Sequence, residues 1–373
     1  MKKNYTLLLL VFTFIGFAQA PANYYNTATG TGYVLKTQLK NIIDDHNAQT
    51  YNDLWTLYTQ TAFRDNYYEN NGSLLDMYSE NPSGTDSYEY TTTNDQCGNY
   101  NSEGDCYNRE HLIAQSYFNE ATPMKTDAFH VVPSDGSVNG ARGNLPFGVV
   151  ASANYTSANG SKRGSNTVNA FSNYSGTVFE PLDEFKGDVA RAFFYFATRY
   201  QDQMPGFYTA ANAASTQVKA MFDGSSDKVF SDDFILLMIK WHKQDAVSAK
   251  ETAYNNAIYS YQGNRNPFID NADYVCTIWT SYCATVDALS TDDFAAMASI
   301  SVYPNPSNGF ITIRSEIGLD DIQLININGQ LIQHIQKPAS INNQYALDNL
   351  PKGFYLLKLS SENQSVTKKV IVN

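Results

Sequence analysis

Apolar residues in the first two thirds of the chain recur with the spacing of amphipathic helices. This spacing predicts helices over residues 35–46, 52–62, 188–200, 231–241 and 248–261. The run at 234–241 is apolar on nearly every side, so its helix should be buried, with Ser231 as its N-cap. Ser248 and Glu251 form a capping box for the last helix. Residues 74–78 read as a strand or short helix, and residues 81–107 as a loop.

The pattern changes after residue 284. Residues 285–299 are small and acidic, which favours a linker. From residue 300 onwards, short alternating runs predict β-strands, and Asn328-Gly329 marks a hairpin turn. About seventy residues of such strands indicate a small all-β sandwich. The fold class is therefore α+β, with a largely helical domain at 21–284 and the sandwich at 300–373.

The first twenty residues have the features of a secretory signal peptide. Two lysines precede an apolar run, and Ala18-Gln19-Ala20 resembles a cleavage site. No later apolar run reaches membrane length, so we expect no membrane span in the mature chain. The chain has 25 basic and 37 acidic residues and a formal net charge of −12. A protein of this charge that binds phosphates must use a few well-placed cations.

Four cysteines fit an exported chain. Cys97 and Cys106 are nine positions apart, and Cys276 and Cys283 are seven apart. Neither spacing is that of a zinc ribbon or a redox motif. Four cysteines allow three connectivities, of which we expect the two local pairs because exported proteins meet an oxidising compartment. Four free thiols are the alternative. If the disulfides organise the site, the protein should be inactive until it is oxidised.

The residues with the clearest chemistry lie between 108 and 148. They form the strings NREH (108–111), DAFHVVP (127–133) and NGARGNLPFG (139–148). His111 can deprotonate water near neutral pH. Glu110 and Asn144 offer oxygen ligands, which favour Mg²⁺ over zinc, with Ca²⁺ or Mn²⁺ as alternatives. Together they predict a metal-dependent phosphodiesterase, with nucleic acid as its substrate.

One geometric condition applies to this pair. Neighbours on a strand point to opposite faces, so Glu110 and His111 can serve one site only near a strand end, at a bulge or around a phosphate gripped from two sides. We expect a strand end. Candidate substrate-binding residues are Arg109, Arg142 and Arg265, since a guanidinium suits phosphate, although each could be an ordinary surface arginine. His130 could contact phosphate or orient the site, and packing is an equally good interpretation.

Several segments in the same order resemble the endonuclease I family of secreted nucleases, which have a ββα-metal (His-Me finger) core. They include DQCGNY (95–100), GDCYNREH (104–111), NLPFG (144–148), KGDVAR (186–191), ATRY (197–200) and QGNRNPFID (262–270). The resemblance implies His111 as general base, Glu110 and Asn144 as metal ligands, and products with a 5′-phosphate. It also implies strands near 110–118 and 128–133 and a helix near 137–145. The phosphate-binding arginine of the family cannot be placed, because no arginine lies between His111 and His130.

The end of the chain resembles a second family, the type A C-terminal sorting domain of the type IX secretion system. The motifs are VYPNPSNG (302–309), NING (326–329), LPKG (350–353) and KKVIV (368–372). We therefore expect a monomeric, secreted or surface-attached endonuclease that cuts DNA, and RNA as well, without sequence preference. Alternatives are an RNA-preferring nuclease of the same fold and a non-catalytic surface-binding protein.

Overall fold

A computed structural model describes residues 20–210, 215–361 and 364–373. The expected signal peptide, apart from residue 20, lies outside these ranges. The chain divides into two units, Met1–Cys283 and Ala284–Asn373. Among the described residues, no helix combines the length and the apolar character that crossing a membrane requires.

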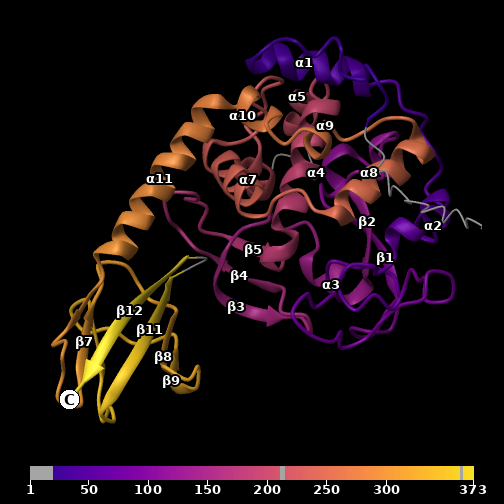
Figure 1. Ribbon diagram of the computed structural model, residues 1–373. Helices are drawn as coiled ribbons and strands as arrows, with labels where there is room; N and C mark the ends of the chain where they lie inside the picture. Colours follow the sequence, from indigo (N-terminus) through magenta and orange to yellow (C-terminus); the bar gives the residue numbers. More distant parts are fainter. Residues whose placement is uncertain (1–19, 211–214, 362–363) are drawn as a thin grey trace, which may run out of the picture. The chain divides into compact units, whose positions relative to one another are not determined.

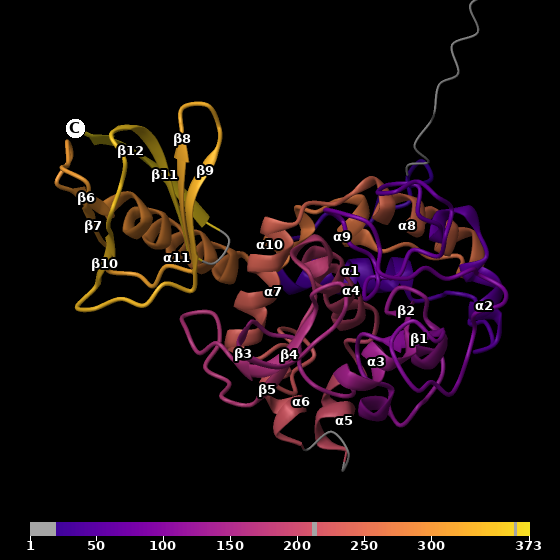
Figure 2. The same cartoon turned by 90° about the horizontal axis from the view of Figure 1, so that it is seen from below.

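The first unit is mainly helical (Figure 1). Its helices are α1 (Gly32–Ile43), α2 (Asp53–Tyr58), α3 (Gly136–Arg142), α4 (Lys186–Arg199), α5 (Met204–Thr209), α6 (Thr216–Met221), α7 (Asp232–Gln244), α8 (Ala249–Gln262), α9 (Pro267–Asp270) and α10 (Tyr274–Ile278). Short 3₁₀ turns are η1 (Thr61–Phe63), η2 (Gln115–Phe118), η3 (Met124–Thr126) and η4 (Asp183–Phe185). Helix α4 is buried almost all round and packs against α1, α7 and α9, which surround it in Figures 1 and 2.

The helix caps follow the sequence signals closely. The Ser231 side chain accepts a hydrogen bond from the Phe234 amide at the start of α7. Ser248 and Glu251 form the predicted capping box of α8. The expected helix at 52–62 is instead two pieces, α2 and η1. Residues 74–78, expected as a strand or short helix, contain one isolated bridge at Leu74 and the start of a turn at 77–79.

Two small antiparallel sheets accompany the helices of this unit. Strands β1 (Tyr107–His111) and β2 (Val131–Asp135) pair directly, with His111 opposite Val131 and Glu110 opposite Val132. A second sheet has the order β3-β4-β5 and consists of β3 (Val150–Thr156), β4 (Lys162–Asn166) and β5 (Thr177–Glu180). Helix α3 follows β2 without an intervening loop, so β1, β2 and α3 form one ββα unit.

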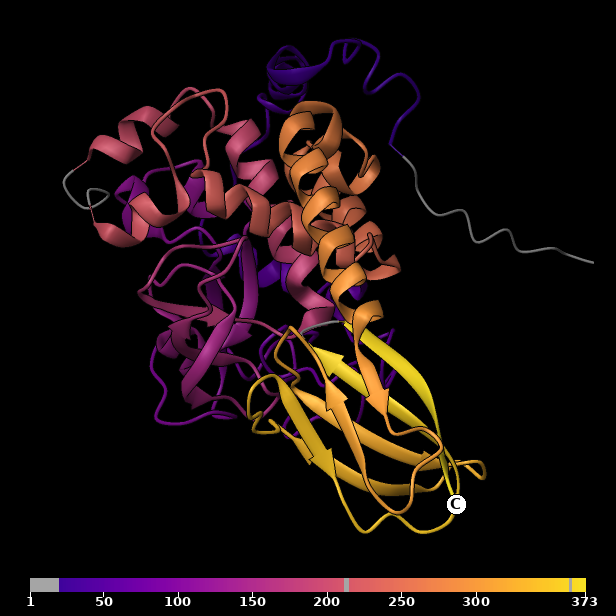
Figure 3. The same cartoon turned by 90° about the vertical axis from the view of Figure 1, so that its left-hand side faces the viewer.

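The second unit consists of two antiparallel sheets (Figure 3). Their orders are β10-β7-β6 and β12-β11-β8-β9. The strands are β6 (Ser301–Tyr303), β7 (Ile311–Arg314), β8 (Asp321–Asn326), β9 (Leu331–Gln336), β10 (Gln344–Leu347), β11 (Gly353–Ser361) and β12 (Gln364–Val372). Both sheets contribute to one apolar core, through residues such as Ile313, Leu324 and Leu357. A shared core between two sheets is what a sandwich requires.

The expected linker at 285–299 lies within a helix, α11 (Thr280–Ser299), which spans the boundary between the units. The sequence of α11 contains neither proline nor glycine, and five of its residues are alanines. Such a composition favours a helix even where no apolar stripe predicts one.

Candidate functional site

The ββα unit places the end of β1 beside α3. The Asp135 carboxylate caps α3 by accepting from the Val138 amide at 2.8 Å. Helix α3 ends at Arg142, earlier than expected, because Gly143 adopts a positive φ of 55°. Strand β1 also ends earlier than predicted, at His111. The Glu110-His111 pair therefore lies at a strand end, as the alternation of strand side chains requires.

His111 is buried, with its Nε2 3.1 Å from the Lys125 carbonyl oxygen. Because a carbonyl can only accept, Nε2 carries the proton, and Nδ1 keeps its lone pair. Burial and, after it, the nearby His130 lower the pKa of His111 to about 3. The ring is thus uncharged at neutral pH and can accept a proton. A bound phosphate would add negative charge and raise this pKa.

Glu110 is also buried, and its carboxylate has different neighbours. Its Oε1 accepts from the Tyr78 hydroxyl at 2.9 Å and lies 3.3 Å from Nη1 of Arg142. Burial raises the pKa of Glu110 to about 7, although Arg142 and Tyr78 oppose the shift. A cation at this carboxylate would favour its ionised form.

Arg142 joins α3 to the end of β1. It is 1% exposed, and its guanidinium donates to the carbonyl oxygens of His111 at 2.8 Å and Leu112 at 2.6 Å. These bonds hold the end of the helix against the strand. Asn144 follows two residues later; it is exposed, and its carbonyl oxygen accepts from the Tyr117 hydroxyl. Asn144 thus follows the end of α3 that Arg142 binds to the strand carrying Glu110 and His111.

His130 and Arg265, two other candidates, are enclosed in the protein. His130 is fully buried; its Nε2 is 2.7 Å from the Met124 carbonyl oxygen, and burial lowers its pKa to about 4. Its ring centroid lies 5.8 Å from that of His111, so the two histidines pack side by side. Arg265 is 2% exposed and forms a two-bond pair with Asp270 at 2.7 Å. These contacts suit structural roles.

A cationic and aromatic group beside His111 was not apparent from the sequence. The Tyr51 ring stacks on His111 with centroids 5.8 Å apart. The Arg109 guanidinium lies 3.5 Å from the Tyr51 centroid and 4.2 Å from that of Trp55. The Lys125 Nζ is 5.3 Å from Tyr51 and pairs with Glu120. Of these residues, only Arg109 is a candidate in the sequence analysis; the available signal for Lys125 is that it is the one lysine or arginine between residues 112 and 129.

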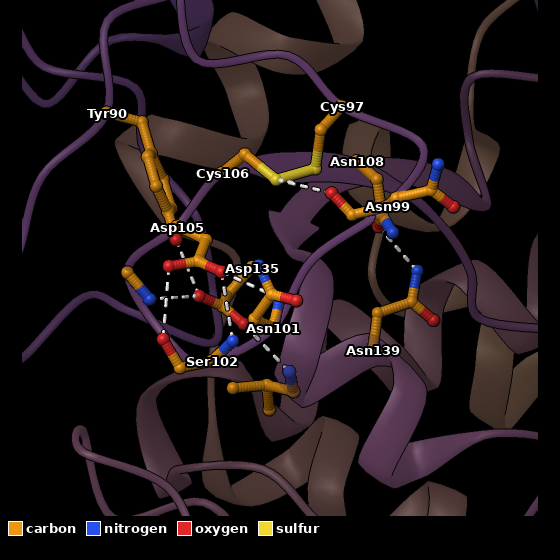
Figure 4. Close-up of a disulfide and its surroundings, with 12 residues drawn as sticks. Tyr90, Cys97, Asn99, Asn101, Ser102, Asp105, Cys106, Asn108, Asp135 and Asn139 are labelled. Carbon is orange, nitrogen blue, oxygen red and sulfur yellow. Dashed lines mark hydrogen bonds between the residues drawn. A yellow bond between two sulfur atoms is a disulfide. The ribbon is translucent and has the colours of Figure 1, made fainter.

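Both expected disulfides are formed, Cys97–Cys106 and Cys276–Cys283, with Cα atoms 5.8 and 5.5 Å apart. The first closes a loop directly before β1 (Figure 4). The Gly136 amide donates to the Cys106 carbonyl at 3.0 Å, and Asp135 accepts from the Gly104 amide at 2.9 Å. This disulfide loop is therefore bonded to the start of α3.

Comparison with known proteins identifies both units. The profile of the family described as Endonuclease I matches residues 31–273, and that of a secretion system C-terminal sorting domain matches residues 301–373. An extracellular ribonuclease of Bacillus amyloliquefaciens is 35% identical over 262 residues, which are 69% of this chain and 78% of that protein. The extracellular ribonuclease of Bacillus subtilis is 33% identical over the same shares. An ulvan lyase of Nonlabens ulvanivorans is 30% identical over 83 residues, 22% of this chain and 16% of that protein.

These similarities define an exported nuclease, a hydrolase of phosphodiester bonds that is directed to the medium or the cell surface. The chain belongs to the endonuclease I family.

Proposed function

We propose that the protein is a divalent-metal-dependent, sequence-nonspecific endonuclease that cuts DNA and RNA and leaves 5′-phosphates. The observation that supports this most directly is the state of His111. Its Nε2 is held by the Lys125 carbonyl, so Nδ1 is left with a lone pair at the end of β1. In this proposal β1, β2 and α3 form the ββα-metal core.

In the proposed site, His111 accepts a proton from the attacking water. Glu110 and Asn144 would hold the cation. A carboxylate and an amide oxygen form a hard donor set, which suits Mg²⁺ and also Ca²⁺ or Mn²⁺. The bound cation would supply Lewis-acid stabilisation of the charge that develops on the phosphate. The contact of Arg142 with Glu110, at the end of the helix that precedes Asn144, supports this pairing of ligands.

Lys125 and Arg109 are the proposed phosphate-binding cations. Both lie at Tyr51, the ring that stacks on His111, and neither is fully buried. Lys125 fixes His111 through its backbone while its side chain reaches a partly exposed position. The residue proposed to bind the scissile phosphate is therefore a lysine, Lys125, in the interval between His111 and His130 where no arginine occurs.

We expect Lys125→Met to lower kcat/KM by about 10–100-fold, because a cation near the scissile phosphate stabilises transition-state charge. The backbone carbonyl that holds His111 is retained. Loss of one phosphate contact should also flatten the dependence of log(kcat/KM) on log[salt]. The measurement is steady-state cleavage at several salt concentrations, with Lys219→Met as the matched exposed lysine on α6. An unchanged rate and salt slope in Lys125→Met would remove this residue from the site.

An RNA-preferring nuclease is the second candidate. It is favoured by the two Bacillus relatives, each of which is named an extracellular ribonuclease. To decide, plasmid DNA and folded RNA are incubated with the purified chain, with Mg²⁺ or with EDTA. We expect cleavage only with Mg²⁺, and the ratio of kcat/KM values gives the preference. No cleavage of either polymer by the folded, oxidised chain would favour a non-catalytic binding protein.

Export is proposed to follow the type IX route. The sorting-domain match at 301–373 supports passage through that machinery, with the signal peptide at 1–20 as the first step. The mature enzyme is proposed to act as a monomer.

The two disulfides should differ in their effect on activity. Removing Cys97–Cys106 by double substitution with alanine should cost about 2–3 kcal/mol of stability, as expected for a short loop. It should also lower activity at least about tenfold at a temperature where the variant is folded, because that loop is bonded to the start of α3.

The matched control is the double substitution at Cys276 and Cys283, which closes a similar loop at α10 and α11. It should lower the melting temperature yet leave the rate of the folded enzyme unchanged. Equal rates in the two double variants would show that the first disulfide only stabilises the fold, and a rate of the parent enzyme unaffected by reductant would contradict activation by oxidation.

A further inference from the structure

An acidic cluster outside the proposed active site consists of Asp65, Glu69 and Glu80. One carboxylate oxygen from each lies within 4.8 Å of the others. The cluster belongs to the irregular segment between η1 and β1, and it includes none of Glu110, His111 and Asn144. A search of the described residues for three or more His, Cys, Asp or Glu side chains close enough to hold a metal ion finds this cluster.

The loop is folded around the Asp65 carboxylate. Its Oδ1 accepts from the amides of Tyr67 at 3.0 Å and Tyr68 at 2.9 Å, and its Oδ2 accepts from that of Asn70 at 2.8 Å. These bonds turn the chain so that Glu69 comes back towards Asp65. The side chain of Asp65 is fully buried and so is fixed in place before any ligand arrives.

Two oxygens of the cluster are buried without a partner. Glu80 is 1% exposed, and its Oε1 has no hydrogen-bond partner in the described structure. Glu69 uses Oε1 to accept from the Asp86 amide at 3.1 Å, while its buried Oε2 is also without a partner. Buried carboxylate oxygens are normally hydrogen-bonded or paired. Two such oxygens beside a third carboxylate therefore form a candidate position for a cation.

No neighbouring positive charge among the described residues neutralises the cluster. Burial and the negative charges of Asp86, Glu69 and Asp65 raise the pKa of Glu80 to about 9. Lys250 opposes this shift, but its Nζ is paired with Asp188 at 2.7 Å. Without a further cation, the cluster must hold a proton or endure repulsion between carboxylates.

We propose that Asp65, Glu69 and Glu80 bind a structural Ca²⁺ ion. All three donors are oxygens, which excludes a preference for zinc or copper. The ligands come from an irregular loop, and Ca²⁺ accepts irregular geometry and additional carbonyl or water ligands, whereas Mg²⁺ requires a near-ideal octahedron. Extracellular modules commonly bind Ca²⁺ with Kd values of about 10⁻⁴–10⁻³ M, the range expected for this exported protein.

The bound ion would also steady the proposed active site. The Glu80 amide donates to the Asp76 carbonyl at 2.9 Å, and Asp76 accepts from the Asp135 amide at 2.6 Å. Tyr78 lies between Asp76 and Glu80 in the sequence, and its hydroxyl donates to the Glu110 carboxylate. The segment from 76 to 80 thus connects the acidic cluster with β2 and with Glu110. Ca²⁺ binding is therefore expected to reduce how often this segment unfolds locally.

The test measures Ca²⁺ binding by the full exported chain through calorimetric titration and thermal melting. Ca²⁺ at about 100 times its Kd should raise the melting temperature by on the order of 5 °C. Glu80→Gln should weaken Ca²⁺ binding at least about tenfold and abolish the rise. Without calcium, this variant should melt at or above the temperature of the parent chain, because glutamine has the same shape as glutamate and the cluster no longer has to hold a proton or a charge at this position. A merely destabilising substitution would do the opposite.

Two controls separate this site from its surroundings. Glu89→Gln makes the same chemical change at an exposed position of the same segment and should retain the Ca²⁺ response. Asn144→Ala removes a proposed ligand of the active-site cation and should also retain it, so the result does not depend on the nuclease mechanism. Undiminished Ca²⁺ binding by Glu80→Gln, or a Ca²⁺ response that Asn144→Ala alone abolishes, would overturn the proposal.

Discussion

His111→Ala is expected to reduce the turnover of nucleic acid by about 10³-fold or more while the fold is retained. The variant loses the Nδ1 lone pair that the Lys125 carbonyl leaves free, and with it the only base proposed for the attacking water. Substrate affinity should change little, because the proposed phosphate and metal contacts come from other residues. The measurement is single-turnover cleavage at saturating Mg²⁺, with circular dichroism to check the fold.

His242→Ala is a close structural control for this experiment. His242 is buried to the same degree, and its Nε2 is 3.2 Å from the Ala272 carbonyl oxygen, as that of His111 is from a carbonyl. It lies on α7, outside the ββα unit. Its loss should lower stability without removing catalysis. Added imidazole should partly restore His111→Ala, since the deletion leaves a cavity next to the substrate. Activity of His111→Ala equal to that of His242→Ala would show that His111 is not the base.

Local signals predicted much of the helical framework. Ser231 and Ser248 cap α7 and α8 as expected because a cap depends on residues within one turn. The predicted ends of the strand and helix that correspond to β1 and α3 were less accurate. The chain leaves β1 at His111 to form η2, and Gly143 ends α3, so the predicted strand and helix each extended several residues beyond the observed ends.

Contacts between distant segments could not be read from the sequence. Tyr51 stacks on His111 across sixty positions, and Lys125 reaches it through a backbone carbonyl. Neither type of contact leaves a local pattern. The acidic cluster was missed for the same reason, since Glu80 is eleven positions from Glu69 in a segment that shows no periodicity. The net charge of −12, by contrast, could be read from the sequence, and it agrees with the proposal that only a few cations, Arg109 and Lys125, bind phosphate.

Glu110→Gln is the second substitution with a large expected effect, a loss of about 10²–10³-fold in kcat/KM. Glutamine keeps the shape of the side chain and an oxygen for the Tyr78 hydroxyl, so the hydrogen bond at 2.9 Å can be retained. What is lost is the negative charge that the proposed cation requires. The Mg²⁺ concentration for half-maximal rate should rise, and the deficit should shrink at high Mg²⁺. A titration of cleavage rate against Mg²⁺ measures both.

Glu110 has a second possible role, because it is also the ionic partner of Arg142 at 3.3 Å. If Glu110 served only to balance Arg142, Glu110→Gln would lower stability but leave the Mg²⁺ requirement of the folded enzyme unchanged. The two carbonyl bonds of Arg142 to His111 and Leu112 should keep the variant folded. Tyr78→Phe provides the comparison, since it removes a neighbour of Glu110 without changing the charge. A larger shift in the Mg²⁺ requirement for Glu110→Gln than for Tyr78→Phe would therefore assign the carboxylate charge to the cation and not to the arginine.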